Sequence, residues 1–425
     1  MNRVAGFNLR RFGERQGECR SPPRSNGEIG MMPENNYDVI VVGAGPGGSS
    51  AAMAAAKKGR KVLLLEKHPI VGYPLCCAEG ISKSGLENIV PLNPRWVASR
   101  VERVLLVGPG GAEARIEHPA AGYVLDRKIF DRDLAARAAR EGAVVKTGTP
   151  AVALLNGDGG PVRGVKVQEE GKPNEYFAPV IIASDGIESR IGFWAGLDTT
   201  LYLSGFDSAA QYLLGGLDVD EECLQFYFGR ELCPGGYAWV FPKGGGTANV
   251  GLAFTPALNA KVKAMELLDK FVQRCFPSAS VIETIVGGVP AYVGKKLLRV
   301  KNVLLVGDAA RLVDSISGAG IANALLSGKI AGETAAEYLP SKHSEKFLDR
   351  YRQNWDRLKG REMRFYLYAR QIYVRMRDAD FDSVIGFVRS IFERKSVAAI
   401  EPIGLLKRVL KENPKLLLLA RHIRW

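Results

Sequence analysis

Residues 37–48 read YDVIVVGAGPGG, an apolar run that leads into a glycine-rich turn. The small residues at 49–56 predict a helix, and the apolar residues at 61–65 predict a second buried strand that ends at Glu66. A strand, a glycine turn, a helix, a second strand and an acid in this order are typical of a dinucleotide-binding βαβ unit. A bare glycine pattern would not exclude an ordinary turn, but the second strand and its acid favour the nucleotide site.

Each glycine of this turn has its own expected role. Gly43 allows the tight turn, Gly45 lets the backbone approach a pyrophosphate, and Gly48 lets the helix pack closely on the strand. The N-terminus of the helix would face the phosphates, and Glu66 would hold ribose hydroxyls. These four residues are therefore candidate cofactor-binding residues.

The composition is that of a globular protein of two or three domains, with 425 residues, 46% apolar and 24% charged. The longest uncharged run, 39–56, approaches the length of a membrane span, but it is the glycine turn itself, so no transmembrane segment is expected. The N-terminus has no apolar stretch typical of a secretory signal. The six cysteines follow no disulfide or zinc spacing, which favours a reduced, cytoplasmic setting without a structural metal. None of the four histidines is assigned to a site.

The net charge of +13 is located at the two ends of the chain. Residues 1–32 hold six arginines against three glutamates, and 341–425 hold twenty Lys and Arg against ten Asp and Glu, whereas 33–340 hold 32 charges of each sign. A basic terminal segment is a solvated face, a nucleic-acid footprint or a segment attracted to an anionic membrane. No nucleic-acid motif accompanies it, so no nucleic-acid partner is expected, and the other two interpretations remain.

Periodicity predicts the elements that follow. Helical spacing covers 127–140, an extended stretch begins at 144–145, a meander of short strands covers 151–182, further strands lie within 206–254, a buried strand covers 298–306, and a helix lies near 318–337. Residues 1–32 lack periodic apolar positions and are expected to be a disordered basic extension, with Met31 or Met32 as an alternative start of translation.

From 343 onward, apolar residues recur every three or four positions. This spacing predicts one long amphipathic helix whose apolar face contains Phe347, Tyr351, Trp355, Leu358, Phe365, Ala369, Ile372 and Met376. The tail at 405–425 is both basic and apolar.

Two further motifs point to a flavin. Residues 181–190 read IIASDGIESR and residues 303–311 read VLLVGDAAR, followed by GAGI at 318–321. Each motif is an apolar strand that ends in a small residue and an acid, which brings a carboxylate to the edge of a cofactor. Either motif alone would be a turn about as often as a site. In the order 43, 185, 308, the three motifs resemble the flavoprotein group typified by aromatic hydroxylases.

That resemblance implies FAD as the cofactor and assigns residues to it. Asp308 would contact the ribityl chain, and Gly320 and Ile321 would face the isoalloxazine ring. Arg127, within YVLDRKIFD, matches the arginine that this group places beside the flavin. Ala151, where the meander begins, is included among the cofactor contacts. Only one dinucleotide fingerprint exists, so reducing equivalents are expected from a transient donor such as NAD(P)H, ferredoxin or a deazaflavin.

Two segments narrow the resemblance. Residues 72–82 read GYPLCCAEGIS and residues 233–244 read CPGGYAWVFPKG. Both look like the geranylgeranyl reductase family, especially its archaeal-type branch that saturates digeranylgeranylglycerophospholipids. The resemblance extends from about 37 to 340 and, more weakly, through the C-terminal helices. Two departures are the second thiol, Cys76, and Ser315, where the family usually has proline.

The family resemblance implies the remaining site residues. Cys77, Ala78 and Gly80 would contact the flavin, and Tyr237, Trp239 and Phe241 would line a tunnel for the prenyl chain. A trisubstituted alkene has no carbonyl that could be polarised, so hydride delivery needs a nearby acid, and Cys77 or a water near Glu79 is the candidate. The alternatives are ordinary packing of aromatic residues in a strand and a small buried hydrophobic role for Cys77.

The fold that follows is α/β, with a Rossmann-type FAD-binding domain, an inserted antiparallel β-sheet substrate domain and a C-terminal helical region. The expected boundaries are 33–205 with 285–340 for the FAD-binding domain, 206–284 for the substrate domain, and 341–425 for the basic helical region. The resulting hypothesis is a cytoplasmic, peripherally membrane-associated FAD-dependent reductase of geranylgeranyl lipids. A flavin monooxygenase acting on an aromatic or quinone, and a redox sensor that uses Cys76 and Cys77, are the alternatives.

Overall fold

The computed structural model describes residues 35–156, 160–291, 298–339, 344–394 and 402–418. The described residues belong to one compact unit that begins at Asn35. The expected disordered extension at 1–32 and the end of the basic tail at 419–425 lie outside the described residues. No helix of the described part is long and apolar enough to cross a membrane.

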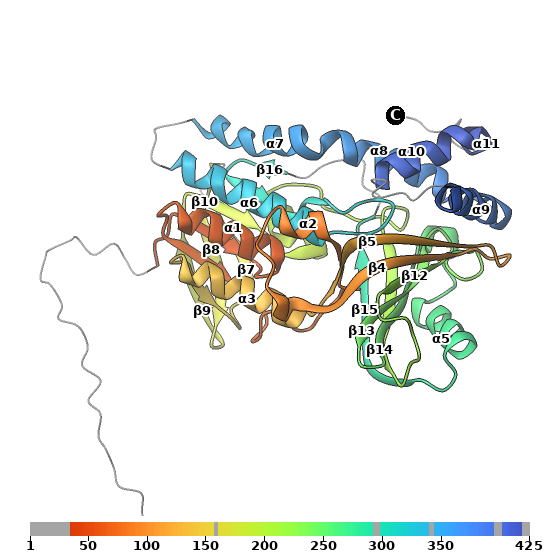
Figure 1. The fold of residues 1–425 in the computed structure, drawn as a ribbon. Coiled ribbons are helices and arrows are strands. Elements are labelled where there is room, and N and C mark those ends of the chain that lie inside the picture. Colours follow the sequence, from red (N-terminus) through yellow and green to blue (C-terminus); the bar gives the residue numbers. More distant parts are fainter. Residues whose placement is uncertain (1–34, 157–159, 292–297, 340–343, 395–401, 419–425) are drawn as a thin grey trace, which may run out of the picture. The chain divides into compact units, whose positions relative to one another are not determined.

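A six-stranded sheet contains the glycine turn (Figure 1). Its order is β16 (Arg299–Val300), β17 (Val303–Leu305), β10 (Val180–Ala183), β1 (Val39–Val42), β2 (Val62–Leu65) and β6 (Val144–Lys146). All neighbours pair in parallel except β16 with β17. The residues of β1, β2, β10 and β17 are all apolar and buried, as expected for parallel strands covered on both faces.

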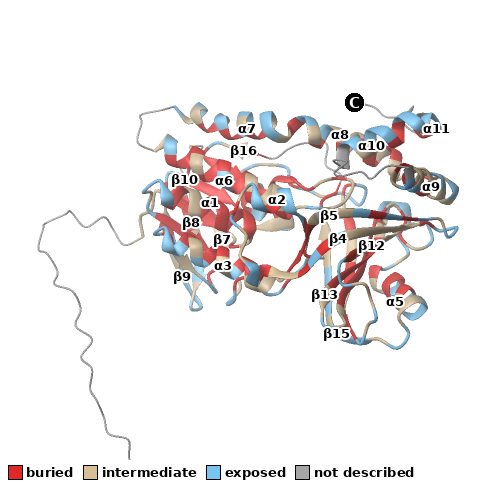
Figure 2. Cartoon of the chain, in the orientation of Figure 1, coloured by how far each residue is buried: buried red, intermediate tan, exposed pale blue. Residues whose placement is uncertain are grey.

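Helix α1 (Pro46–Lys57) packs closely on α6 (Ile321–Tyr338) and on α3 (Arg127–Arg140). A Cβ atom at Gly328 would lie 2.0 Å from the Gly47 carbonyl oxygen, and one at Gly332 would lie 2.3 Å from that of Ala51. The two helices therefore meet backbone to backbone. Buried residues fill α1 and the part of α6 that faces it (Figure 2).

The second sheet has eight strands and is antiparallel except where β12 pairs with β4. Its order is β15 (Ser280–Val289), β11 (Asp207–Gly215), β14 (Thr247–Phe254), β13 (Tyr237–Gly244), β12 (Cys223–Tyr227), β4 (Val97–Val107), β5 (Glu113–Leu125) and β3 (Gly80–Ser82). Helix α5 (Ala264–Cys275) packs on β11 and β14. The sheet thus extends beyond the segment 206–284, because β3, β4 and β5 come from the part of the chain expected in the FAD-binding domain.

A three-stranded antiparallel sheet forms the meander expected at 151–182. It consists of β7 (Ala151–Asn156), β8 (Val162–Glu169) and β9 (Lys172–Phe177), and the next strand, β10, leaves it for the parallel sheet. The short helices α2 (Lys83–Glu87) and α4 (Arg190–Trp194) complete this part of the chain.

Two predicted elements differ from the structure. The strand predicted at 298–306 is a tight hairpin of β16 and β17, with Lys301 at a positive φ of 47° between them. The helix predicted from 343 consists of α7 (Asp349–Trp355), a π-helical turn (Asp356–Gly360) and α8 (Arg361–Tyr373). Because the π turn shifts the helical phase, Leu358 is 52% exposed instead of lying on the apolar face.

The chain ends in α9 (Asp378–Arg394), α10 (Pro402–Glu412) and α11 (Pro414–Leu418). Buried residues of α8 and α9, together with Val409, Leu410 and Leu416, form one apolar cluster with β5 residues Ala114 and Ile116. The apolar part of the C-terminal region is therefore used to cover the second sheet.

Candidate active site

The glycine turn between β1 and α1 has one crowded side and one open side. Gly43 has a φ of 100°, and a Cβ atom there would lie 2.2 Å from the Ser184 carbonyl oxygen. A Cβ atom at Gly48 would lie 1.8 Å from the Gly43 carbonyl oxygen, whereas one at Gly45 would meet no described atom within 4 Å. Gly43 and Gly48 thus permit the local packing, and Gly45 leaves space over the N-terminus of α1, where a pyrophosphate fits.

Glu66 follows β2 and is linked to this turn. Its carboxylate accepts hydrogen bonds from the Ala44 N–H and the His68 N–H, both at 2.9 Å. The His68 ring Nδ1 also lies 2.9 Å from Glu66 Oε1, although no histidine was expected here. Each carboxylate oxygen can accept a further hydrogen bond, so ribose hydroxyls fit this position. Ala151 lies two residues after Thr149, whose N–H donates to the Glu66 carbonyl oxygen.

Asp308 lies at the end of β17, next to the start of α6. A Cβ atom at Gly320 would lie 3.2 Å from Asp308 Oδ1, so these two residues are neighbours, and Ile321 begins α6. Burial raises the pKa of Asp308, while the positive charges of Arg127 and Arg311 oppose this shift. The carboxylate accepts no hydrogen bond from any residue that the structure describes. It is therefore available to the hydroxyls of a ribityl chain.

The segment 76–80, the cysteine loop, is fixed at Glu79. Glu79 is 3% exposed and has a positive φ of 73°. Its Oε1 accepts from the Arg127 N–H at 2.8 Å, and its Oε2 accepts from Lys243 Nζ at 2.6 Å and Asn249 Nδ2 at 2.7 Å. With three donors on its carboxylate, Glu79 is an anchor for the loop.

Arg127 lies beside the same loop, at the first position of α3. Its guanidinium makes a two-point ion pair with Asp131, with both N–O distances at 2.7 Å. The Cys77 Sγ atom accepts a hydrogen bond from the Glu79 N–H at 3.2 Å. Burial raises the pKa of the Cys77 thiol, and the charge of Arg127 acts in the opposite direction.

Tyr237, Trp239 and Phe241 alternate along β13 and share one face, which we call the aromatic face. The ring centroids of Tyr237 and Trp239 lie 5.9 Å apart, and those of Trp239 and Phe241 lie 6.3 Å apart. A Cβ atom at Gly80 would lie 2.9 Å from the Phe241 ring. The cysteine loop and the aromatic face are therefore in contact.

The loop after Asp314 contacts the hydroxyl end of Tyr237. The Asp314 carboxylate accepts hydrogen bonds from the Ile316 N–H at 2.7 Å and from Ser317 Oγ at 2.7 Å, and these bonds close the loop around Ser315, where the family resemblance predicts a proline. The Tyr237 hydroxyl donates to the Ser317 carbonyl oxygen.

Three polar residues at this site were missed in the sequence. Gln211, Lys243 and Asn249 lie on neighbouring strands of the second sheet and donate hydrogen bonds to the cysteine loop. Gln211 and Asn249 are polar residues inside largely apolar strands, and that is the signal that could have identified them.

Two family models match successive parts of the chain. Residues 38–212 match the family described as FAD dependent oxidoreductase, and residues 205–289 match the geranylgeranyl reductase catalytic domain. The digeranylgeranylglycerophospholipid reductase of Methanothrix thermoacetophila is 40% identical over 391 residues, which cover 91% of this chain and 99% of that protein. The chain belongs to the geranylgeranyl reductase family.

Other members agree with this assignment. The digeranylgeranylglycerophospholipid reductase of Methanosarcina mazei is 39% identical and covers 90% of this chain and 95% of its own length. The crystal structure of a geranylgeranyl bacteriochlorophyll reductase-like protein from Thermoplasma acidophilum has a TM-score of 0.85 and 33% identity, and the match covers 90% of this chain and 98% of that one. The expected family, the α/β fold with its C-terminal helices, the class of enzyme and FAD as cofactor are confirmed. The individual contacts to FAD stay predictions.

Proposed function

We propose that this geranylgeranyl reductase hydrogenates the C=C double bonds of geranylgeranyl chains, with digeranylgeranylglycerophospholipids as its substrates. The names of its relatives support the substrate class. The observation that carries the proposal is the contact between the cysteine loop and the aromatic face, which joins the expected cofactor site to an apolar wall. The comparisons do not favour hydroxylation of an aromatic or quinone.

A cavity lined by Phe228, whose ring centroid lies 6.3 Å from that of Tyr237, supports an isoprenoid substrate. It has a volume of about 170 Å³ and lies between the second sheet and the C-terminal helices. Its walls are apolar and aromatic, and they include Phe228, Ile316, Ala369 and Leu410. Such walls suit a hydrocarbon chain, because they offer no polar group that would lose its hydrogen bonds to water.

The chemistry divides between FAD and the protein. Once reduced by an external two-electron donor, bound FAD would supply the hydride to one carbon of the double bond, and an acid of the protein would give a proton to the other carbon. We assign this acid to Cys77: burial keeps its thiol protonated, while the Arg127 charge and the Glu79 N–H stabilise the thiolate that forms. Glu79 holds the loop, and the aromatic face excludes water from the reacting carbons.

The test is anaerobic incubation of the FAD-loaded protein with a chemical reductant and digeranylgeranylglycerophospholipid, followed by mass spectrometry of the lipid. Each reduced bond adds two mass units. Cys77→Ser is expected to lower turnover by about a hundredfold, whereas Cys76→Ser keeps it, because Cys76 is exposed. Addition of sixteen mass units in air, with no anaerobic reduction, would show a monooxygenase instead.

We also propose that the enzyme, acting in the cytoplasm, contacts an anionic membrane through its C-terminal region and receives electrons from a transient donor. Exposed cationic side chains on α10 and α11 support this contact: Lys407, Arg408, Lys411 and Lys415. Leu410 and Leu416 of the same helices are buried in the protein, so the attraction would be electrostatic.

Replacing these four cations with Gln is expected to weaken binding to anionic vesicles by about 1 kcal/mol per residue at low salt. Co-sedimentation measures this loss. A control variant with four exposed lysines of the other helices and strands replaced, Lys57, Lys83, Lys172 and Lys270, should bind as the wild type does. Equal binding of both variants would contradict the proposed contact.

A further inference from the structure

Gln211 connects the two parts of the reaction site. It lies on β11, is 3% exposed, and has a hydrogen-bond partner on each side of its amide. The Trp239 indole N–H donates to Gln211 Oε1 at 2.9 Å, and Gln211 Nε2 donates to the Cys77 carbonyl oxygen at 3.3 Å. One side chain thus bonds both the central residue of the aromatic face and the peptide of the proposed acid.

The register of the sheet explains how Trp239 reaches Gln211. Both residues are directly paired with Gly251, which lies on β14 between their strands. A Cβ atom at Gly251 would lie 2.5 Å from the Trp239 ring. Because this position has no side chain, the indole crosses the middle strand and meets the amide on the next one.

The chemistry of the two partners restricts the residue at 211. The indole N–H can only donate and the Cys77 carbonyl can only accept, so the bridging group needs one acceptor and one donor at the same time. A glutamine amide meets this requirement without charge. An ionised glutamate lacks the donor, and a leucine of similar size lacks both groups.

The neighbouring contacts do not replace this bridge. Asn249 Nδ2 donates to the Ala78 carbonyl oxygen at 3.3 Å, and Lys243 pairs with Glu79, so both act on residues 78 and 79. No other hydrogen bond to the Cys77 carbonyl is found among the described residues. The position of the Cys77 peptide along the aromatic face therefore depends on residue 211.

We propose that Gln211 is a positioning residue of this reductase, which ties the Cys77 peptide to Trp239 and so fixes where the thiol lies relative to the aromatic face. This inference rests on the proposed function for its role in turnover. The hydrogen bonds of Gln211 do not depend on the substrate. An experiment without the lipid can therefore test the positioning role of Gln211 separately from the proposed function.

The experiment measures alkylation of Cys77 by iodoacetamide in the full-length FAD-loaded protein, in a Cys76→Ser background, with peptide mass spectrometry as readout. Gln211→Leu frees the peptide, and Cys77 is expected to react about tenfold faster than in the wild type, as for the loss of a buried hydrogen bond. Turnover of the lipid at saturation should fall by a similar factor, while its KM changes less.

Gln211→Glu gives a second, pH-dependent test. A protonated carboxyl group restores both the acceptor and the donor, so the alkylation rate relative to wild type should be close to one at low pH and rise about tenfold as the carboxyl ionises. Arg127 and the Glu79–Lys243 pair also face this position and are the same in both proteins. Because the new carboxylate raises the pKa of the Cys77 thiol, each alkylation rate is divided by the thiolate fraction of that variant at the same pH. Gln353→Glu, on the exposed side of α7, is the matched control and should show no pH-dependent ratio.

Equal alkylation rates of Cys77 in the wild type and in Gln211→Glu at every pH would overturn the inference. This test does not require Gln211→Leu to fold. If the proposed function is wrong, the result differs. The wild type then leaves the lipid unchanged, while the alkylation ratios still depend on residue 211.

Discussion

The two large sheets place their polar groups differently. In the six-stranded sheet the four central strands β1, β2, β10 and β17 are wholly apolar, Glu66 directly follows β2, and Asp308 lies three residues after the end of β17. In the eight-stranded sheet, buried polar side chains lie within or just beyond the strands, at Asp207, Gln211, Asn249 and Thr255. Ligands bind a parallel sheet at the carboxyl ends of its strands, whereas they bind an antiparallel sheet on one face. Each buried polar group on that face needs a hydrogen-bond partner from elsewhere in the chain.

The largest effect is expected where the antiparallel sheet meets the C-terminal helices. Arg370 of α8 is 3% exposed, and its Nη2 lies 2.6 Å and 2.7 Å from the two carboxylate oxygens of Asp207. Arg370→Leu leaves that carboxylate buried without its cation and should lower the free energy of unfolding in urea at pH 7 by about 3–5 kcal/mol. Burial already raises the pKa of Asp207. The variant should therefore recover stability as pH falls and the carboxyl binds a proton.

The matched control breaks an exposed pair on the neighbouring segment. The Arg377 side chain is 74% exposed and pairs with Asp380. Arg377→Ala should cost less than about 1 kcal/mol. If Arg370→Leu cost no more than this control, the buried pair would not link α8 to the sheet.

An intermediate effect is expected at the open side of the glycine turn. Gly45→Ala meets no described atom within 4 Å, so the fold should keep its stability, but the methyl group enters the space proposed for the pyrophosphate. FAD affinity, measured by quenching of flavin fluorescence, should fall about tenfold or more, which corresponds to about 1.4 kcal/mol. Gly386→Ala, at an equally open position in α9, should bind FAD as the wild type does. Unchanged affinity of Gly45→Ala would place the phosphates elsewhere.

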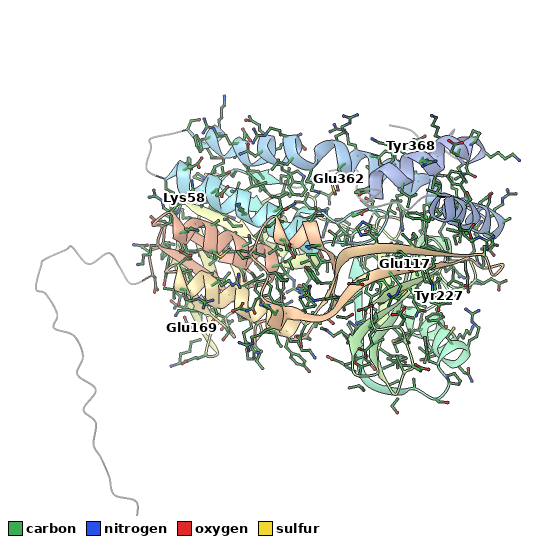
Figure 3. The ribbon with its side chains drawn as sticks, viewed as in Figure 1. Lys58, Glu117, Glu169, Tyr227, Glu362 and Tyr368 are labelled. Carbon is green, nitrogen blue, oxygen red and sulfur yellow. The ribbon has the colours of Figure 1, made fainter. Side chains whose placement is uncertain are left out.

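The smallest effect is expected on the three-stranded sheet, at Glu169 (Figure 3). Hydrogen bonds from Lys146, Tyr176 and Asn174 lower the pKa of Glu169 to about 2 from its usual 4.5. The pKa of Glu169 is lower in the folded than in the unfolded protein. The ionised carboxylate therefore stabilises the fold fully above about pH 4.5, and this stabilisation is lost as pH falls toward 2. Glu169→Gln should therefore cost about 1 kcal/mol at pH 7 and progressively less in acid. A cost that is independent of pH would contradict the ion pair.

Sequence reasoning worked best where a feature is local. The glycine turn, α1, β2 and Glu66 lie within thirty consecutive residues, and their order alone predicts the βαβ unit. Helix α3 also has the predicted bounds, 127–140, because its apolar positions face one core. The substrate role of the aromatic face was expected from the family resemblance, and alternation in a single strand was the alternative explanation.

Features that depend on distant segments were missed for physical reasons. Strands β4 and β5 lie before residue 126 but belong to the second sheet, because β4 pairs with β12 and β5 pairs with β4. Nothing in the residues of β4 specifies β12 as its partner. Gln211 has a role only because Gly251 and Trp239 lie opposite one another in register. The π turn at 356–360 adds no distinctive residue type, so periodicity extends one helix through it.

The π turn also sets how α8 is rotated about the helix axis relative to α7. Helix α7 lies beside the six-stranded sheet, where the Tyr351 hydroxyl donates to the Leu305 carbonyl oxygen, and α8 carries Arg370 to the eight-stranded sheet. Successive residues of a helix are turned by about 100°. Deleting a single residue between Asp356 and Gly360 would rotate the Arg370 guanidinium by about 100° around the helix axis, away from Asp207. A one-residue deletion here would thus separate Arg370 from Asp207 and leave the Tyr351 hydrogen bond to Leu305 in place.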